Sequence, residues 1–124
     1  MSCLFCKFKD NREKVVLDND LAFAIFDGFP VSKGHMLVIP KRHAEAYFDL
    51  TKEELTAMQE LAHKCKELLD NKYKPDGYNI GFNCGEAGGQ TIFHCHMHII
   101  PRYKGDIENP RGGVRKILVD NSNY

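Results

Sequence analysis

"TIFHCHMHIIPRY", residues 91–103, is the stretch that most constrains the fold of this chain. Its β-branched and aromatic residues favour a strand, in which successive side chains point to opposite faces. His94, His96 and His98 would therefore project from one face of a strand over 91–103. We expect the opposite face, which is apolar throughout, to pack against a helix. Its residues are Phe93, Cys95, Met97 and Ile99.

The partner for that face is "TKEELTAMQELAHKCKELLDNKY", residues 51–73, which predicts a helix over about 51–71. Thr51 and Glu54 have the spacing of a capping box, in which each side chain bonds the other residue's backbone N–H. Apolar residues then recur at helical spacing and form a single stripe. The stripe consists of Leu55, Met58, Leu61, Ala62, Cys65, Leu68 and Leu69.

Shorter apolar runs bounded by Asn, Asp, Gly and Pro predict the remaining strands. Three strands precede the helix and two follow it, which indicates an α+β domain with a mostly antiparallel sheet. We also expect "RKILV", 115–119, to form a short strand in the tail. The strands are expected over 14–18, 21–27, 34–40, 77–85 and 91–103.

Size and charge limit the class of protein. The 124 residues fit a single domain over 1–124, and 17 basic and 17 acidic residues give a formal net charge of zero. A neutral balance does not support nucleic-acid or membrane-surface binding. No apolar run reaches the roughly 20 residues of a membrane span, and the N-terminus does not look like a secretory signal. We therefore expect a cytoplasmic protein whose five cysteines are not a disulfide framework.

Three imidazoles on one strand face need an explanation. Burying them without partners would cost several kcal/mol, on the order of 2 for each group. The settings that avoid this cost are a solvated cleft, a metal site or a hydrogen-bonded catalytic row. A polar outer face that happens to be rich in histidine is the remaining interpretation, although Gln, Thr or Lys would serve it equally well.

The pattern "HCHMHII", 94–100, resembles the signature of the histidine triad family, which comprises nucleotide-binding hydrolases and transferases. Further blocks resemble the family as well, so the resemblance covers about 1–103. It implies a five-stranded antiparallel sheet with one long helix, usually in a homodimer whose two sheets are continuous. The further blocks are "GGQT" at 88–91, "PR" at 101–102, "GHMLVIPKRH" at 34–43 and "AIFDGFP" at 24–30.

The resemblance assigns catalytic roles to three histidines. His96 would attack the α-phosphorus of a nucleotide and form a nucleotidyl-histidine intermediate that water then cleaves. His98 would bind phosphate oxygens, and His35 matches a separate active-site histidine of the family. A neutral imidazole suits such an attack, provided that its other ring nitrogen donates its proton to an acceptor. We expect that acceptor to be a backbone carbonyl.

The resemblance also implies a site for a purine nucleotide. Asn83 matches a phosphate-contacting asparagine, and Gln90 and Thr91 could supply side-chain donors to the phosphate. Asp27 matches the carboxylate that takes the ribose hydroxyls, although from the residues alone it is equally a turn residue. Apolar residues are candidates for the base pocket, and alternation along the strand lets only some of them reach it. They are Leu4, Phe5, Phe23, Ile25 and Phe26.

"CLFC" places Cys3 and Cys6 in a CxxC arrangement, which is a common half of a tetrahedral zinc site. Some relatives in the family complete such a site with a histidine after the third strand and the first triad histidine. His43 and His94 match these positions here. Four protein ligands leave no open coordination position, so this zinc would be structural. A redox pair is the alternative interpretation of the CxxC.

Three functions remain open from the sequence. The first is a hydrolase acting through His96 on nucleoside phosphoramidates or dinucleoside polyphosphates, with the Gln90-Thr91 pair favouring the latter. The second is a metallohydrolase whose triad holds a catalytic zinc, and the third is a nucleotide-binding regulatory protein with negligible turnover. The tail, 104–124, is either solvated or contributes to substrate choice, with Arg111 as a candidate contact.

Overall fold

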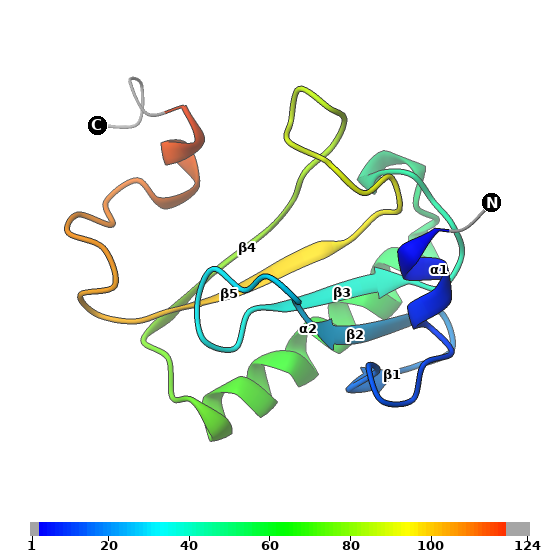
Figure 1. Ribbon diagram of the computed structural model, residues 1–124, viewed down its shortest axis with the longest axis horizontal. Coiled ribbons are helices and arrows are strands. Elements are labelled where there is room, and N and C mark those ends of the chain that lie inside the picture. Colours follow the sequence, from blue (N-terminus) through cyan, green and yellow to red (C-terminus); the bar gives the residue numbers. More distant parts are fainter. Residues whose placement is uncertain (1–2, 119–124) are drawn as a thin grey trace.

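A computed structural model describes residues 3–118 as an α+β domain (Figure 1). No helix among these residues is long and apolar enough to cross a membrane. The domain has two layers, a sheet and one 21-residue helix, α2. In chain order the elements are α1 (Leu4–Phe8), β1 (Leu17–Asp18), β2 (Ala22–Phe26), β3 (Met36–Pro40), the 3-10 turn η1 (Tyr47–Asp49), α2 (Lys52–Lys72), β4 (Gly77–Phe82), β5 (Met97–Arg102) and the 3-10 turn η2 (Gly113–Ile117).

The sheet has five strands in the order β1-β2-β3-β5-β4, and every neighbouring pair is antiparallel. The predicted fold class, a five-stranded antiparallel sheet with one long helix, is confirmed. The two edges differ, because β1 has only two residues whereas β4 has six. Within the described residues no further strand pairs with the outer edge of β4.

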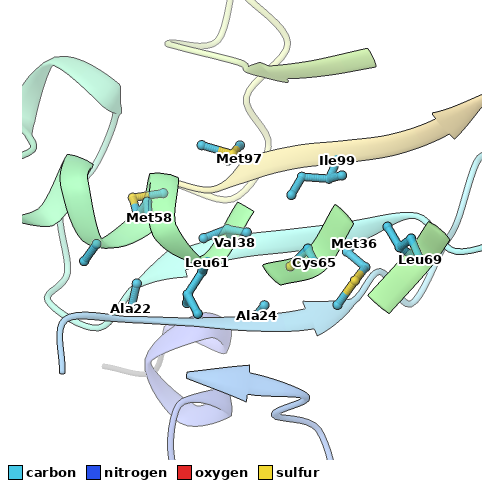
Figure 2. Close-up of a cluster of buried hydrophobic side chains, with 11 residues drawn as sticks. Ala22, Ala24, Met36, Val38, Met58, Leu61, Cys65, Leu69, Met97 and Ile99 are labelled. Atoms are coloured by element: carbon cyan, nitrogen blue, oxygen red, sulfur yellow. The ribbon is translucent and has the colours of Figure 1, made fainter. Parts of the chain in front are cut away.

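Helix α2 packs against one face of the sheet (Figure 2). Met58, Leu61, Cys65 and Leu69 enter the core from the helix, as the apolar stripe predicts. The helix begins at the predicted capping box, in which the Thr51 side chain accepts from the N–H of Glu54. The sheet contributes Ala22 and Ala24 from β2, Met36 and Val38 from β3, and Met97 and Ile99 from β5.

The opposite face of the sheet carries a second, smaller core under α1. Phe5 of α1 is 3% exposed and packs on Phe23 and Ile25 of β2 and on Leu37 and Ile39 of β3. His98 of β5 pairs with Leu37 and therefore shares this face. The alternation predicted for the histidine strand thus separates His98 from the helix-facing Met97 and Ile99.

Several predicted strands differ in extent or kind, since the strand expected over 14–18 covers only Leu17–Asp18 and the one expected over 77–85 ends at Phe82. The strand predicted over 91–103 begins only at Met97, because the backbone before it bonds outside the ladder: the N–H of Cys95 donates to the carbonyl of Ala44. Of the strand predicted over 115–119, the described residues 115–118 form no strand, since Gly113–Ile117 is a 3-10 turn. Tail residues 119–124 lie outside the described part of the chain.

A charged pair joins the loop after β3 to the start of α2. Glu54 is 4% exposed, and its two carboxylate oxygens accept from Nε and from a terminal nitrogen of Arg42, each at 2.8 Å. The N–H of Thr51 donates to the same carboxylate. The Arg42 hydrogen bonds outweigh the effect of burial and lower the pKa of Glu54 to about 2. The loop that carries His43 is therefore tied to the helix by an ionised carboxylate.

Glu54→Gln should lower the unfolding free energy at pH 7 by about 1–2 kcal/mol, a value discounted because Arg42 is half exposed and screened by water. Glu54 has a depressed folded-state pKa, so its contribution is present above its unfolded pKa of 4.5 and is lost as the pH falls toward about 2. Urea unfolding between pH 7 and 3 checks this expectation. The variant's stability should fall less steeply with acid than that of the wild type, whereas Glu60→Gln, at an exposed position of α2, should follow the wild type.

Candidate functional site

A cleft of about 410 Å³ lies on the α1 side of the sheet. It is bounded by α1, by the loop between β2 and β3, and by residues 83–96 before β5. His35, His96 and His98 line it, as do Asp27, Asn83 and Thr91, and with Phe5 and Ile25 eight of the predicted catalytic and substrate-binding residues come together here. The remaining wall is mainly apolar, with Lys14, Gly28 and Gly89 beside the apolar residues Leu4, Phe5, Phe8, Ile25, Phe29, Val31, Leu37 and Ile92.

His96 has a defined tautomer. Its Nδ1 lies 2.9 Å from the backbone carbonyl oxygen of His94. A carbonyl only accepts, so Nδ1 carries the proton and Nε2 keeps its lone pair. The backbone carbonyl expected from the sequence is thus that of His94. This contact is possible because the chain at 94–96 lies outside the strand ladder. The arrangement makes Nε2 a nucleophile at the wall of the cleft.

His35 and His98 form a second hydrogen-bonded unit. The N–H of Val31 donates to Nδ1 of His35 at 3.2 Å, so neutral His35 carries its proton on Nε2. That Nε2 lies 3.0 Å from Nδ1 of His98, which must then accept. His98 is left with an Nε2–H donor, the kind of group that binds a phosphate oxygen. The chain Val31–His35–His98 therefore orients a donor beside a nucleophile.

Gly34 permits the placement of His35. Its φ is +91°, a region that favours glycine, and a Cβ atom there would lie 2.8 Å from the ring of Tyr73 and 2.9 Å from Leu69. Any side chain would push the loop away from the end of α2. The main chain beyond is fixed as well, since the N–H of Asp27 donates to the carbonyl of His35.

Burial keeps the three cleft histidines neutral. It is the main cause of the lowered pKa of His35 and of His96, and the nearby Asp27 carboxylate opposes it in both. For His98, burial, followed by the electrostatic effect of the neighbouring His96 and His35 rings, lowers the pKa to about 4. At pH 7 His96 is therefore unprotonated at Nε2, which a nucleophile requires.

Asp27 is placed both as a turn residue and as a candidate ribose-binding carboxylate, the two interpretations that the sequence left open. One carboxylate oxygen accepts from the N–H of Phe29 in a turn, and the other lies 3.5 Å from Nε2 of His35 and faces the cleft. Asn83 and Thr91 are exposed at the rim. These three residues offer an acceptor and polar side chains around the histidines.

Gln90 does not lie in the cleft, contrary to its predicted role as a phosphate donor. Its amide nitrogen donates to the carbonyls of Glu45 and Ile92, and its carbonyl oxygen accepts from the N–H of Gly85. The side chain is buried, 3% exposed, and holds the loop over 85–90 in place. Because these partners are distant in sequence or are backbone groups, the residue pattern did not reveal them.

The base-pocket candidates divide between the two faces of β2. Leu4, Phe5 and Ile25 line the cleft. Phe26 points to the other face, where it packs beside the helix core under Lys72, and Phe23 is fully buried beneath α1. Phe26, predicted as a base contact, therefore packs beside the helix core instead, and the division agrees with the expectation that only some of the five candidates reach the cleft.

Several residues of the cleft wall were not predicted from the sequence, among them Phe8 and Lys14. Phe8 lies one helical turn after Phe5, and the sequence gives this spacing, but α1 is too short for a periodic signal. Lys14, which also lines the cleft, stands in a stretch that favoured a strand.

Cys3, Cys6, His43 and His94 converge beside α1. Their ligand-type atoms all lie within 4.8 Å of one another. Sγ of Cys3 is 3.3 Å from Nδ1 of His94, and Sγ of Cys6 is 3.3 Å from Nδ1 of His43 and 3.5 Å from Nδ1 of His94. Ligands of a tetrahedral zinc ion are separated by roughly 3.3–3.8 Å. The predicted set of four therefore fits a zinc ion.

The surroundings of this cluster agree with a metal site. His94 is 0% exposed, and its Nε2 lies 2.8 Å from the carbonyl of Pro40, to which it must donate. A proton on Nε2 leaves Nδ1 free to bind a metal, and such a carbonyl partner is typical around metal-bound histidine. Both cysteine sulfurs lie beside imidazole nitrogens, an arrangement that favours a metal site over a redox pair.

The same bonds argue against one catalytic zinc shared by the triad. Nδ1 of His94 faces the cysteines, and Nδ1 of His96 is held by a carbonyl, so the three rings do not converge on one point. Asp27, His35 and His98 also lie close together. However, the Val31 N–H directed at His35 fixes a proton on the very nitrogen that would have to bind the metal.

The HIT domain model matches residues 9–105. This chain belongs to the HIT domain family. Among its HIT relatives, an uncharacterised HIT-like protein of Methanocaldococcus jannaschii is 40% identical over 121 residues, which are 95% of this chain and 93% of that protein. The bis(5'-adenosyl)-triphosphatase of Dictyostelium discoideum is 38% identical over 98 residues, 79% of this chain and 66% of that protein.

Solved HIT structures share the fold. A zinc-bound histidine triad family protein from Mycobacterium smegmatis superposes with a TM-score of 0.77 at 33% identity, over 86% of this chain and 78% of that one. In this HIT protein, none of the tail residues 104–118 lines the cleft of the same chain. A contact of Arg111 with substrate therefore stays a prediction.

The His98 ring should remain neutral from pH 7 down to pH 5 and titrate near pH 4, because protonation would place a charge in a buried row of histidines. Ring nitrogen chemical shifts of the labelled protein measure this directly. A midpoint at or above 6.5 would contradict the expectation. The same spectra should show proton-bearing Nδ1 for His96 and proton-bearing Nε2 for His98.

Proposed function

We propose that this chain is a nucleotide hydrolase that cleaves a bond at the α-phosphate of a purine nucleotide through a covalent intermediate on His96. The proposal rests on one observation above all: the 2.9 Å contact between His96 Nδ1 and the His94 carbonyl leaves Nε2 as a free lone pair in the cleft. A regulatory protein that only holds nucleotide would not need this tautomer.

In the first step, Nε2 of His96 attacks the α-phosphorus. A phosphorus–nitrogen bond forms, the bond between phosphorus and the leaving group breaks, and its electron pair departs with the leaving group. Nε2–H of His98 donates to a phosphate oxygen, so charge that develops there meets a positioned donor. The proton on Nδ1 of His96 stays beside the His94 carbonyl, which stabilises the cationic ring of the intermediate.

In the second step, water attacks the same phosphorus from the side that the leaving group vacated. The phosphorus–nitrogen bond breaks, its electron pair returns to Nε2 of His96, one proton of the water passes to solvent, and a nucleoside monophosphate is released. Two displacements of moderate difficulty thus replace one difficult attack by water.

The nucleotide is held by groups on both sides of His96. The inward oxygen of Asp27 accepts from the ribose hydroxyls, and Asn83 and Thr91 contact phosphate at the rim. Phe5, Phe8 and Ile25 provide apolar surface for the base, because aromatic rings stack on any purine. The phosphate thereby lies against the histidines and the base under α1.

Structural zinc belongs to the same proposal, with Cys3, Cys6, His43 and His94 as its four ligands. Bound there, zinc would link α1 to the backbone of the nucleophile and would supply folding free energy rather than chemistry. The Pro40 carbonyl orients the zinc ligand His94. It accepts from Nε2 and so keeps the lone pair of Nδ1 directed toward the cysteines.

A second groove offers room for the leaving group. It has a volume of about 340 Å³ and shares Val31 with the cleft. Ile100 and Arg102 follow His98 along the same face of β5 and line this groove with Lys116. Asp106 also lines the groove and pairs with Arg102, so Lys116 supplies the charge that would favour a leaving group carrying phosphate, as in a dinucleoside polyphosphate.

His96→Ala should abolish the covalent intermediate and lower kcat by at least about a thousand-fold, because the nucleophile is lost. The protein is incubated briefly with diadenosine triphosphate or an adenosine phosphoramidate, each labelled at the α-phosphorus. An alkaline quench then preserves the acid-labile phosphoramidate bond to the protein. Label should remain on the wild type and be absent from His96→Ala.

His63→Ala is the matched control, because His63 is exposed on α2 and does not line the cleft. It should keep both label and turnover. Turnover in His96→Ala equal to that of the wild type would refute covalent catalysis, and nucleotide binding without turnover in the wild type would favour a regulatory role.

Removing zinc should destabilise the protein before it affects the chemistry. Cys6→Ser should lower the melting temperature by at least about 10 °C, because the cluster joins α1 to the rest of the domain. Thermal unfolding with and without chelator, together with metal content, measures the effect. Cys84→Ser, a change outside the cluster, should retain zinc and stability, and a folded, zinc-free but fully stable Cys6→Ser would count against the site.

A further inference from the structure

We propose that Lys14 makes this cleft selective for 6-oxopurine nucleotides, those of guanine and hypoxanthine, over 6-aminopurine nucleotides. The inference rests on the proposed function, because it takes the nucleotide to lie with its phosphate at His96 and its base under α1. It concerns the far end of the cleft, where no catalytic group lies.

A row of rings leads from the catalytic histidine to Lys14. The centroids of His96 and Phe5 are 5.0 Å apart, and those of Phe5 and Phe8 are 6.1 Å apart. Nζ of Lys14 lies 5.0 Å from the centroid of Phe8. A nucleotide bound with phosphorus at His96 and its base on the phenylalanines therefore directs the outer edge of the base toward Lys14.

Lys14 is held at this place by the turn before β1. The side-chain oxygen of Asn11 accepts from the N–H groups of Glu13 and Lys14, and the Asn11 carbonyl accepts from Lys14 as well. Its side chain is partly buried and lies over the face of Phe8, where a cation is attracted by the ring.

The ammonium group is available for a ligand. Within the part of the chain that the structure describes, no carboxylate lies within 4.0 Å of Nζ of Lys14. The nearest described partner is an aromatic ring, which uses the charge but none of the three N–H donors.

The chemistry of the base edge then decides the preference. Guanine and hypoxanthine present two acceptors side by side, O6 and N7, and a lysine ammonium binds that pair well. Adenine presents N7 beside an N6 amino group, which is a donor and repels another donor. A group that carries only donors therefore separates the two classes of purine.

The experiment compares dissociation constants of GMP, IMP and AMP for the full chain, measured by calorimetry. IMP and AMP differ only at the 6-position and its ring proton, so any phosphate, ribose or stacking contribution cancels in their ratio. The wild type should bind IMP and GMP roughly ten-fold more tightly than AMP, the discrimination expected of one lysine–purine contact.

Lys14→Met removes the charge and keeps an unbranched side chain over Phe8, and it should reduce the IMP-to-AMP preference to within about two-fold. Lys14→Arg should keep a preference for IMP, because it retains donors and charge. Lys64→Met, an exposed lysine on α2 outside the cleft, should match the wild type. Far-ultraviolet circular dichroism of each variant confirms that it is folded.

Three results would overturn the inference. One is equal binding of IMP and AMP by the wild type, and another is a preference for IMP that survives in Lys14→Met. The third is a uniform loss of all three nucleotides in Lys14→Met with the ratio unchanged, which would place Lys14 at a phosphate. A wild type that binds none of the three removes the proposed function as well, whereas the other results leave that function standing.

Discussion

The side chain and backbone of His94 engage three other parts of the chain. Its ring is fully buried, with Nε2 on the Pro40 carbonyl and Nδ1 toward Cys3 and Cys6, while its own carbonyl accepts from His96. Rotation of this residue would release β3, the cysteine cluster and the tautomer of His96 together. A buried polar side chain is tolerated because every polar atom has a partner.

Desolvation keeps the three cleft histidines neutral, and a neutral imidazole can act as a nucleophile or as a hydrogen-bond donor. In water these rings would be partly protonated near neutral pH, and a protonated ring is neither a nucleophile nor a one-sided donor. The cleft lowers the pKa of His35, His96 and His98, and Val31 and His94 then decide which nitrogen keeps the proton. Main-chain groups distinguish two imidazoles of identical chemistry, giving one a lone pair and the other a donor.

The amino-acid sequence predicted the architecture and most of the cleft for identifiable physical reasons. The capping box at Thr51 and the stripe of α2 are local patterns, and they located that helix to within one residue at each end. Strand alternation placed His98 opposite the helix face. His94 and His96 instead lie in an irregular stretch, because tertiary hydrogen bonds outweigh β-propensity there.

The errors share a cause, which is that their partners are remote in sequence. Gln90 looked like a free donor, yet its amide is used by the carbonyl of Glu45, 45 residues away. Phe26 and Ile25 are neighbours on β2, and only the placement of α1 decides which of them borders the cleft. Helix α1 itself spans five residues, too few to give a periodic signal, so Phe8 and Lys14 could not be placed beforehand.

The two edges of the sheet set a limit on how chains of this kind can add to one another. An exposed edge strand is a template for pairing, and the six residues of β4 form one whereas the two residues of β1 are too few. A chain with only one long edge strand can pair with only one other chain through that strand. If two β4 strands met in antiparallel register, the product would have a twofold axis and no long edge left. Growth by strand addition would stop at that point, so the unequal edges protect the fold against open-ended, fibre-like assembly.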